Sequence, residues 1–262
     1  MYAWTLRCQE WPKLMMQPQD RIAAAMTLDA ANTAKLVANV AAVRTRIAAA
    51  ACAVGRSPGE VQLLPVTKSV PVAVIAALLE LGLVDHGENR PERLPELALA
   101  FPAARRPRWH LIGHIQSRKL RDAVPLATCV HSVHSLELVE RIEARCAEVG
   151  RVLPVLLQVN VSSESRKQGL DPADLATVLA HAQRCTHLAV QGLMTMAPLD
   201  ATPAVQRATF AGLRQLRDAH RTAARALPEL SMGMSADFEI AVEEGATMVR
   251  VGSALYEGLH FD

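Results

Sequence analysis

The chain has 262 residues, of which 50% are hydrophobic and 21% are charged. This composition is that of a folded protein with a large core, and it excludes an intrinsically disordered chain. Lysine and arginine outnumber aspartate and glutamate by only 28 to 26, so we expect no nucleic-acid partner. The five cysteines are widely separated and form no C-x-x-C pair, which favours reduced thiols in the cytoplasm.

We expect neither a membrane span nor a targeting segment. No apolar run approaches the roughly 18 residues that cross a bilayer, because charges interrupt each candidate. The first 26 residues include Trp4, Trp11 and Lys13 but no apolar signal region. We therefore interpret residues 1–26 as a poorly ordered N-terminal extension and residues 27–262 as one folded domain.

The predicted elements begin with an amphipathic helix over Leu28–Val54, which is rich in Ala, Leu and Val and ends near Gly55. The run Val61–Thr67 has the composition of a strand, and a helix that starts with proline, Pro71–Leu81, follows it. The alternation continues through seven further strand-like runs: Leu83–His86, Trp109–Gly113, Thr128–His131, Pro154–Val161, Leu188–Leu193, Leu230–Met232 and Thr247–Val251.

Strands that alternate with helices in this way predict an α/β fold, a single (β/α)8 TIM barrel preceded by an extra N-terminal helix. An open doubly wound sheet is the competing architecture. The barrel is favoured because no G-x-G-x-x-G turn follows the first strand, where a dinucleotide-binding sheet would carry one. In a barrel, the chemistry gathers at the carboxyl ends of the strands.

Lys68 directly follows the first predicted strand, where a barrel directs side chains into its mouth. A lysine that is partly withdrawn from water loses preference for its charged form, so its amine can condense with an aldehyde. Position alone favours a simpler interpretation, a solvated lysine at the start of a loop.

Two turns at the ends of the last two predicted strands suit a phosphate group. Gly233-Met234-Ser235 follows the seventh strand, and the eighth ends in Arg250-Val251-Gly252-Ser253. Glycine lets the backbone approach closely, and successive N–H groups beside a serine hydroxyl can bind phosphate. Strands one and eight are neighbours in a closed barrel, so Lys68 and these turns together predict a site for pyridoxal 5'-phosphate (PLP).

Two further segments carry polar groups at strand ends. The second strand ends in His86-Gly87-Glu88-Asn89, and Asn89 can hydrogen-bond a hydroxyl on the cofactor ring. The alternative for Asn89 is a helix cap, since Pro91 stands where a first turn would begin. The run from Ser162 to Lys167 is either an anion site or a solvated loop.

We expect no metal site. His110 and His114 are four residues apart, but they lie at a change from strand to loop, where helical metal-ligand spacing does not apply. His131 and His134 offer no third ligand.

Six segments, in this order, resemble the pyridoxal phosphate homeostasis proteins: LLPVTK, HGEN, WHLIGHIQSRK, QVNVSSESRKQGL, GLMTMAP and SMGMSADFEIAVEEGATMVRVGSALYEG. The resemblance implies a monomeric barrel like the N-terminal domain of alanine racemase, with Lys68 as the Schiff-base lysine. It also implies Arg250 near the pyridine nitrogen and Asn89 near the ring. The residues that it implies around the phosphate are Ser235, Gly252 and Ser253.

The chain departs from the family pattern at two of these segments. His86 stands where the family commonly has an aromatic residue, and Arg118 stands where it often has asparagine. We expect the first change to affect packing and the second to affect an outer surface.

These features predict a PLP-binding protein that holds the cofactor as a Schiff base and takes part in intracellular vitamin B6 homeostasis, without catalytic turnover. A fixed cation at Arg250 disfavours the protonated ring and weakens the electron sink that catalysis needs. The resemblance implies that racemases of this barrel type take a second base from a β domain of a partner subunit. We expect no such domain here, because the chain ends ten residues after Gly252. We interpret Tyr256 as a packing residue rather than a base.

Two other functions remain open. A small alanine-racemase-like amino-acid racemase would use the same fold. A Schiff-base aldolase acting on phosphosugars is the third candidate, although its lysine usually lies on a central strand. For the preferred function we expect PLP as the ligand, PLP-dependent enzymes as clients, and a monomer in the cytoplasm.

Overall fold

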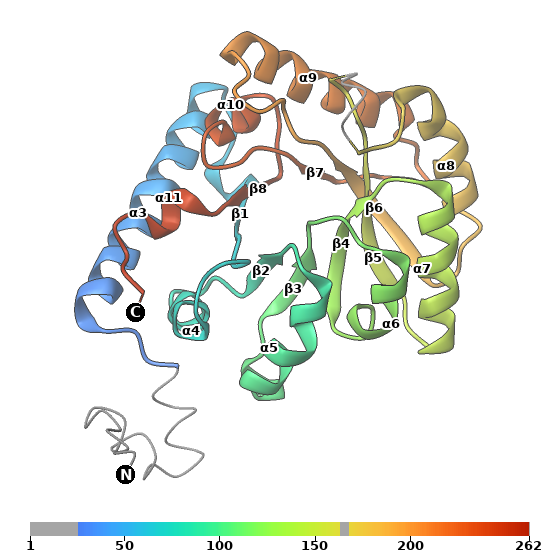
Figure 1. Cartoon of the computed structure of the whole chain (residues 1–262). Helices are drawn as coiled ribbons and strands as arrows, with labels where there is room; N and C mark the ends of the chain where they lie inside the picture. Colours follow the sequence, from blue (N-terminus) through green and yellow to red (C-terminus); the bar gives the residue numbers. More distant parts are fainter. Residues whose placement is uncertain (1–25, 163–167, 262) are drawn as a thin grey trace, which may run out of the picture.

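Eight parallel strands form the centre of the computed structural model, which describes residues 26–162 and 168–261 (Figure 1). Residues 1–25, most of the predicted N-terminal extension, therefore lie outside the described residues. The strands are β1 (Gln62–Pro65), β2 (Asp85–Glu88), β3 (Arg108–Leu111), β4 (Ala127–Val133), β5 (Leu153–Gln158), β6 (Leu188–Met194), β7 (Glu229–Ser231) and β8 (Met248–Val251).

The sheet curls into a nearly closed barrel, as the sequence predicts. Its strand order is β1-β8-β7-β6-β5-β4-β3-β2, which leaves β1 and β2 at the two edges. A parallel bridge between Val66 and Gly87 joins these edges just beyond the two strands, and the Thr67 N–H donates to the Gly87 carbonyl at 2.9 Å. This closure excludes the open doubly wound sheet and brings the ends of β8, β1 and β2 to one rim.

Helices surround the barrel (Figure 1). Side-chain oxygens of Asp29, Ser135 and Thr202 cap three of them by accepting backbone N–H groups of the first turn. The helices are α3 (Ala30–Ala53), α4 (Val72–Glu80), α5 (Leu94–Ala100), α6 (Leu120–Ala123), α7 (Leu136–Glu148), α8 (Leu175–Ala182), α9 (Pro203–His220), α10 (Phe238–Glu243) and α11 (Ser253–Tyr256). Short 3-10 turns are η1 (Pro58–Glu60), η2 (Pro91–Arg93), η3 (Ala103–Arg105), η4 (Ser117–Lys119) and η5 (Pro172–Asp174).

The predicted extra helix is α3, and it joins the two ends of the described chain. Its buried residues recur at helical spacing, including Leu36, Val40, Val43 and Ile47, so that one side of the helix packs on the core. The Asn39 side-chain amide donates to the carbonyls of Leu255 and Glu257 at 3.0 and 2.9 Å. Figure 1 shows the C-terminal segment and α11 alongside α3.

Helix α3 also corrects one prediction from the sequence. By length and composition it is apolar enough to cross a membrane, whereas we predicted that no run would qualify. Its apolar side contacts the barrel domain, and Arg46 on the same helix pairs with Glu239 of α10 and lies 4.5 Å from the centre of the Phe238 ring. These contacts explain the apolar residues on the side of the helix that faces the barrel.

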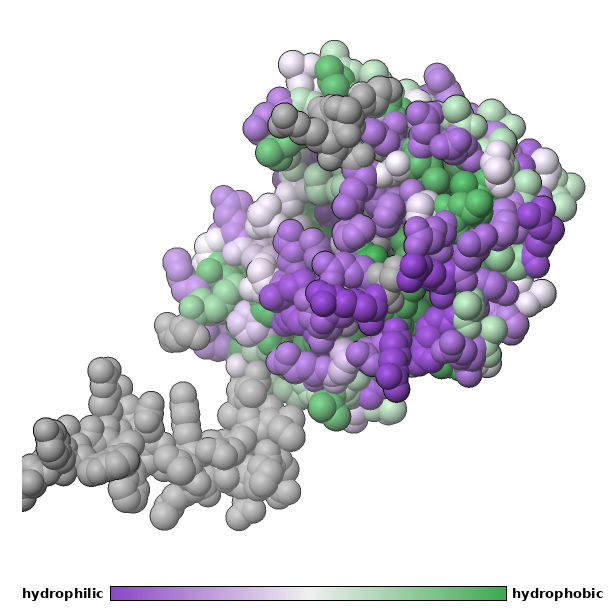
Figure 2. All heavy atoms as spheres, turned by 45° about the vertical axis from the view of Figure 1, so that its right-hand side comes forward, coloured by the Kyte–Doolittle hydropathy of each residue, from purple (hydrophilic) through white to green (hydrophobic). Residues whose placement is uncertain are grey.

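Two separate apolar clusters fill the molecule. The larger one lies between strands and helices, and its largest fully buried side chains include Trp109, Phe101 and Phe210. A small second cluster contains Cys129, Leu156 and Met194. Because side chains alternate across a strand, the second cluster belongs to the inside of the barrel. Figure 2 shows that hydrophilic residues predominate on the face that it views, with hydrophobic residues in small patches between them.

His86, the first departure from the family pattern, is fully buried beside Trp109. The two rings meet edge to face with centroids 5.7 Å apart, and His86 Nε2 donates to the Leu83 carbonyl at 2.8 Å. Within the described residues its Nδ1 atom has no hydrogen-bond partner. Burial lowers the pKa of His86 to about 4, so the ring is neutral at pH 7 and fills the place of an aromatic side chain.

We predict that His86→Phe makes the protein more resistant to acid. The pKa of His86 is lower in the folded state than in the unfolded state, so unfolding takes up a proton between about pH 6.5 and pH 4 and stability falls as the pH is lowered. Phenylalanine removes this loss, which amounts to about 1.4 kcal/mol per pH unit. Urea unfolding at pH 7.5, 6 and 5 measures the effect, and curves for the two proteins that stay parallel over this range would show that His86 does not titrate as inferred.

Candidate functional site

Lys68 lies in the turn that follows β1, at the carboxyl rim of the barrel as predicted. Its side chain is exposed, which agrees with the solvated lysine that position favours and not with an amine partly withdrawn from water. The reason is that β1 ends at Pro65 and the chain leaves the barrel wall after the bridge at Val66. An amine in this position is open to an aldehyde that arrives from solvent.

Three residues from the next strand end fix the turn that carries Lys68. Arg90 and Arg93 donate to the Lys68 carbonyl oxygen at 2.7 and 2.9 Å. Arg93 also pairs with the carboxylate of Glu88 at 2.9 Å, and the Glu88 side chain is completely buried. The other Glu88 oxygen accepts the N–H groups of Asn89 and Arg90. The backbone at Lys68 is therefore held in place while its amine stays free to move.

Ser235 and Gly252 lie together on the other side of Lys68. The N–H groups of Gly252 and Ala254 both donate to Ser235 Oγ, at 3.2 and 3.3 Å. Two N–H groups that converge on one oxygen are the arrangement that binds a phosphate oxygen. A Cβ added to Gly252 would lie 3.5 Å from Val66, which places this turn directly beside the end of β1. Ser253 is exposed at the start of α11.

Asn89 is half-buried at the end of β2 and does not cap a helix, since η2 has Arg90 at its N-cap. The helix-cap alternative is therefore wrong. A Cβ at Gly113 would lie only 2.4 Å from the Asn89 carbonyl oxygen, so a side chain at residue 113 would displace Asn89. The glycine at the end of β3 thus sets the position of Asn89 on the rim.

Arg250 lies on β8 and is only 3% exposed, so its charge is inside the protein. Its guanidinium donates to Ser231 Oγ on β7 at 2.7 Å and to the Thr195 carbonyl, just after β6, at 2.9 Å. Burial lowers the pKa of Arg250 to about 10, which still leaves the group protonated at neutral pH. A guanidinium has five N–H groups, so donors remain for a ligand.

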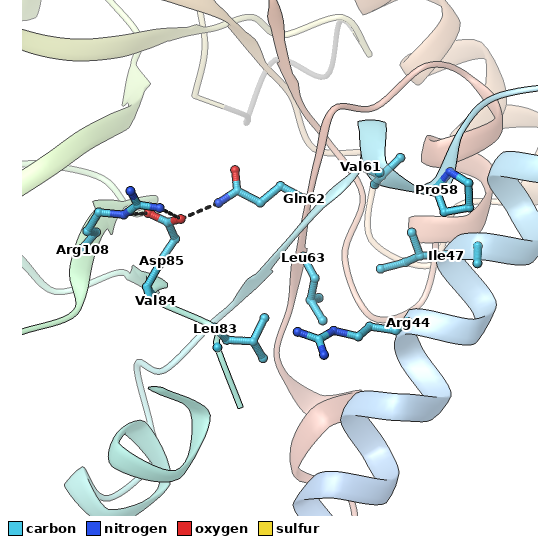
Figure 3. Close-up of a pocket in the computed structure, with 13 residues that line it drawn as sticks. Arg44, Ile47, Pro58, Val61, Gln62, Leu63, Leu83, Val84, Asp85 and Arg108 are labelled. Carbon is cyan, nitrogen blue, oxygen red and sulfur yellow. Dashed lines mark hydrogen bonds and ion pairs between the residues drawn. The ribbon is translucent and has the colours of Figure 1, made fainter. Parts of the chain in front are cut away.

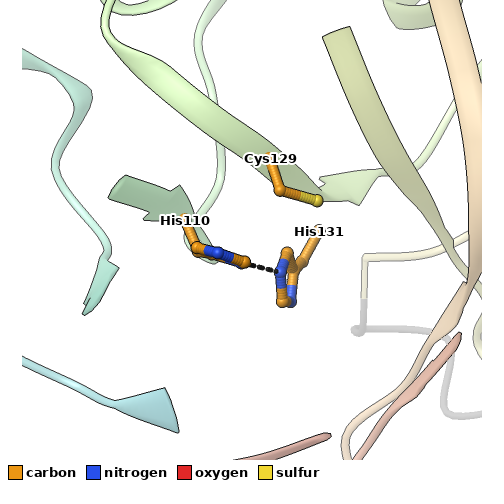
Figure 4. A group of neighbouring side chains, drawn as sticks. All are labelled: His110, Cys129 and His131. Atoms are coloured by element: carbon orange, nitrogen blue, oxygen red, sulfur yellow. Dashed lines mark hydrogen bonds between the residues drawn. The ribbon is translucent and has the colours of Figure 1, made fainter. Parts of the chain in front are cut away.

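From Ser231 the hydrogen bonds continue across the barrel. Ser231 Oγ lies 2.9 Å from His131 Nδ1, His131 Nε2 lies 2.9 Å from His110 Nδ1 (Figure 4), and His110 Nε2 lies 2.9 Å from Asp85 Oδ1. We call this series, Arg250 to Ser231 to His131 to His110 to Asp85, the buried chain. It begins below the rim and ends at the first residue of β2.

Asp85 is the anionic end of the buried chain. Gln62 donates to it at 2.7 Å and Arg108 at 2.8 and 2.5 Å (Figure 3). Burial alone would raise the pKa of Asp85, but the hydrogen bonds from His110 and Arg108 lower it to about 2. The carboxylate is therefore ionised at neutral pH.

His110, Cys129 and His131 also form a cluster whose possible ligand atoms lie within 4.8 Å of one another (Figure 4). The sequence suggested other pairings, His110 with His114 and His131 with His134, and the fold does not bring the residues together in that way. In the structure the facing ring nitrogens share a hydrogen bond, and burial raises the pKa of the Cys129 thiol to about 12. These contacts describe a hydrogen-bonded pair of imidazoles beside a neutral thiol.

A cavity of about 600 Å³ lies at the opposite end of the barrel from Lys68, between α3 and the starts of β1 to β3 (Figure 3). Arg44, Gln62, Asp85 and Arg108 give it a polar rim, and Ile47 belongs to its apolar lining. The barrel rule places chemistry at the carboxyl ends, so we assign the functional site to the Lys68 rim.

The remaining sequence candidates have plain structural roles or fall outside the described part of the chain. Tyr256 packs against the core with its hydroxyl buried, and burial raises its pKa, so it is no proton acceptor at neutral pH. Arg118 is exposed and contacts Gln116. The anion site considered for Ser162 to Lys167 lies outside the described residues, apart from Ser162.

Comparisons with known proteins identify the family. The model of the alanine racemase N-terminal domain matches residues 31–259. The pyridoxal phosphate homeostasis protein of Pseudomonas aeruginosa is 39% identical over 226 residues, which cover 83% of this chain and 93% of that protein. The one from Aquifex aeolicus is 37% identical over 222 residues, covering 82% and 94%. This chain belongs to the pyridoxal phosphate homeostasis protein family.

Solved structures extend the likeness to the fold. PipY of Synechococcus elongatus, solved with PLP bound, is 36% identical, has a TM-score of 0.70, and is covered over 99% of its length by 82% of this chain. An unknown protein from Bifidobacterium adolescentis has a TM-score of 0.79 at 34% identity, with 87% of this chain covering 97% of it. Alanine racemase of Clostridium difficile shares the fold with a TM-score of 0.67 at 16% identity, and this chain spans 58% of that chain.

We predict that Arg93→Ala destabilises the protein by about 3 kcal/mol, because it leaves the buried Glu88 carboxylate without its cation. Arg105→Ala is the matched control: Arg105 pairs with Glu80 on the surface, where both side chains are 66% exposed, and should lose less than about 1 kcal/mol. Chemical denaturation of the two variants measures the difference. Equal losses would mean that the contact between Arg93 and Glu88 does not hold the turn of Lys68.

Proposed function

We propose that this protein binds PLP as a Schiff base on Lys68 and takes part in intracellular vitamin B6 homeostasis, without catalytic turnover. The observation that carries the proposal is the placement of three groups at one end of the barrel, two at the rim and one below it. They are an exposed amine on a fixed turn, two N–H groups that converge on Ser235 Oγ, and a buried cation with free donors.

These groups fit the cofactor. When bound, PLP supplies an aldehyde that condenses reversibly with an amine. Lys68 is the amine, and the N–H groups of Gly252 and Ala254, with Ser235 and Ser253, suit the phosphate. Arg250 suits the ring nitrogen and Asn89 the ring. Membership in a family whose PipY structure holds PLP supports this assignment.

The absence of turnover is supported by the charge and packing around the site. A fixed arginine beside the ring nitrogen opposes protonation of the ring, which an electron sink requires. Tyr256, the candidate for a second base, has a buried hydroxyl whose pKa is raised. We propose a carrier that holds the aldehyde and releases it to PLP-dependent client enzymes, acting as a cytoplasmic monomer without nucleic-acid or membrane partners.

Lys68→Ala tests the linkage. Purified wild-type protein loaded with PLP should show visible absorption, and borohydride should fix the cofactor on the peptide that contains Lys68. Lys68→Ala should show neither, yet its cofactor-free melting temperature should stay within about 2 °C of the wild type, because an exposed side chain contributes little to packing.

Lys119→Ala is the control for this experiment, because Lys119 also lies near the rim, beside Asn89 in a small cavity. It should behave like the wild type. Labelling of any other lysine in the wild-type protein would contradict the assignment of Lys68. Incubation with single L-amino acids followed by chiral analysis separates the alternative function, since robust racemisation would contradict a carrier without turnover.

A further inference from the structure

The buried chain is unusual for the inside of a barrel. Such interiors are filled mainly by branched apolar side chains, yet here Ser231 and His131 are at most 1% exposed and His110 is 7% exposed. Buried polar groups are costly unless they are hydrogen-bonded, and here each one has a partner at 2.7 to 2.9 Å. The buried chain connects Arg250 to Asp85, and none of the hydrogen bonds described for it reaches Lys68 or the turn of Ser235 and Gly252.

The chemistry of its members fixes the direction of the hydrogen bonds at the two ends of the buried chain. An arginine can only donate, so Ser231 Oγ accepts from Arg250. Burial lowers the pKa of His131 far below its ordinary value, so the ring is neutral and one of its two nitrogens donates while the other accepts, between Ser231 Oγ and His110 Nδ1. His110 Nε2–H then donates to the Asp85 carboxylate. The buried chain thus links a cation to an anion through four successive hydrogen bonds, an arrangement in which each bond polarises the next.

The orientation of the Arg250 guanidinium depends on the buried chain. Among the described residues, its acceptors are Ser231 Oγ and the Thr195 carbonyl, and a planar group held at both Nη atoms cannot rotate. Without the Ser231 oxygen it would keep a single anchor and could turn about it. The other charged or titratable groups that act on the chain are Asp237 on Arg250, Arg108 on Asp85, and Glu229 on the neighbouring Cys129.

We propose that Ser231 and His131, supported by His110 and Asp85, are positioning residues that hold Arg250 against the ring nitrogen of bound PLP and thereby keep that nitrogen unprotonated. This inference rests on the proposed function. The inference goes beyond the proposed function, because residues that do not touch the cofactor would set the protonation state of its ring nitrogen. A purely structural role for the chain would stabilise the barrel but leave the ring nitrogen unaffected.

The test is nitrogen NMR of the full-length protein loaded with PLP that is labelled with ¹⁵N in its ring. In the wild type the ring nitrogen should be unprotonated at neutral pH and should protonate with a midpoint at acidic pH. In Ser231→Ala its protonation midpoint should rise by about one pH unit, a tenfold change in proton affinity, because the fixed cation is lost. His131→Phe, which keeps a ring but removes both nitrogens, should shift the midpoint in the same direction by less.

Two further variants control for packing. Cys129→Ala removes a side chain from the same barrel interior, two residues from His131, and leaves the hydrogen bonds of the buried chain intact. The protonation midpoint of the ring nitrogen in this variant should equal that of the wild type. Ser231→Thr restores the hydroxyl and should restore the midpoint. An unchanged midpoint in both Ser231→Ala and His131→Phe, or an equal shift in Cys129→Ala, would overturn the proposal.

A measurement without cofactor separates failure of this inference from failure of the proposed function. The Arg250 guanidinium N–H signals should exchange slowly with water in the wild type and in Cys129→Ala, and quickly in Ser231→Ala. Equal exchange in all three proteins would overturn the positioning role even if PLP binds. Absence of visible absorption in PLP-treated wild-type protein would instead overturn the proposed function.

Discussion

Burying the charge of Arg250 inside the barrel is the constraint on which the rest of the structure depends. A desolvated guanidinium costs several kcal/mol unless acceptors surround it, and a barrel of apolar strands offers few. Here β7 supplies Ser231, β4 supplies His131, β3 supplies His110 and β2 supplies Asp85. The registers of these strands are coupled, because a slip by one residue would turn a chain member outward and bring its neighbour inside.

The same arrangement divides the site into a fixed part and a mobile part. Arg250 is held deep in the barrel on two acceptors, and Glu88 with Arg93 anchors the backbone at Lys68 from outside the wall. The Lys68 side chain is exposed to solvent. An amine that is free to move beside a fixed phosphate turn and a fixed cation is suited to taking up an aldehyde and giving it back, which is what a carrier must do.

The barrel and the rim residues could be predicted from the sequence because their signals are local. Alternating strands and helices indicate the fold, and Lys68, Ser235 and Gly252 stand within four residues of the ends of β1, β7 and β8, which the fold brings to one rim. Position along the sequence favoured an exposed Lys68, and the structure agrees, since β1 ends at Pro65, earlier than the apolar run suggests. The apolar composition of α3 was misjudged although it is visible in the sequence; what the sequence does not show is which side of the helix the barrel covers.

The buried chain was missed for a different reason. His110 and His131 are 21 residues apart and meet only because β3 and β4 are adjacent, whereas spacing along the sequence directed attention to His114 and His134. Glu88 and Arg93 were likewise visible in the sequence, but a buried ion pair is not distinguishable there from two solvated charges. The one available signal was the presence of histidine, serine and arginine at inward positions of strands that are otherwise apolar.

A crystal structure of the PLP-loaded protein tests the central claim most directly. We expect the ring nitrogen within hydrogen-bond distance of Arg250, with Arg250 still bonded to Ser231, and the cofactor joined to Lys68. A cofactor whose ring nitrogen faces a carboxylate, or an Arg250 that has left Ser231 to reach it, would contradict a cation fixed in advance by the buried chain.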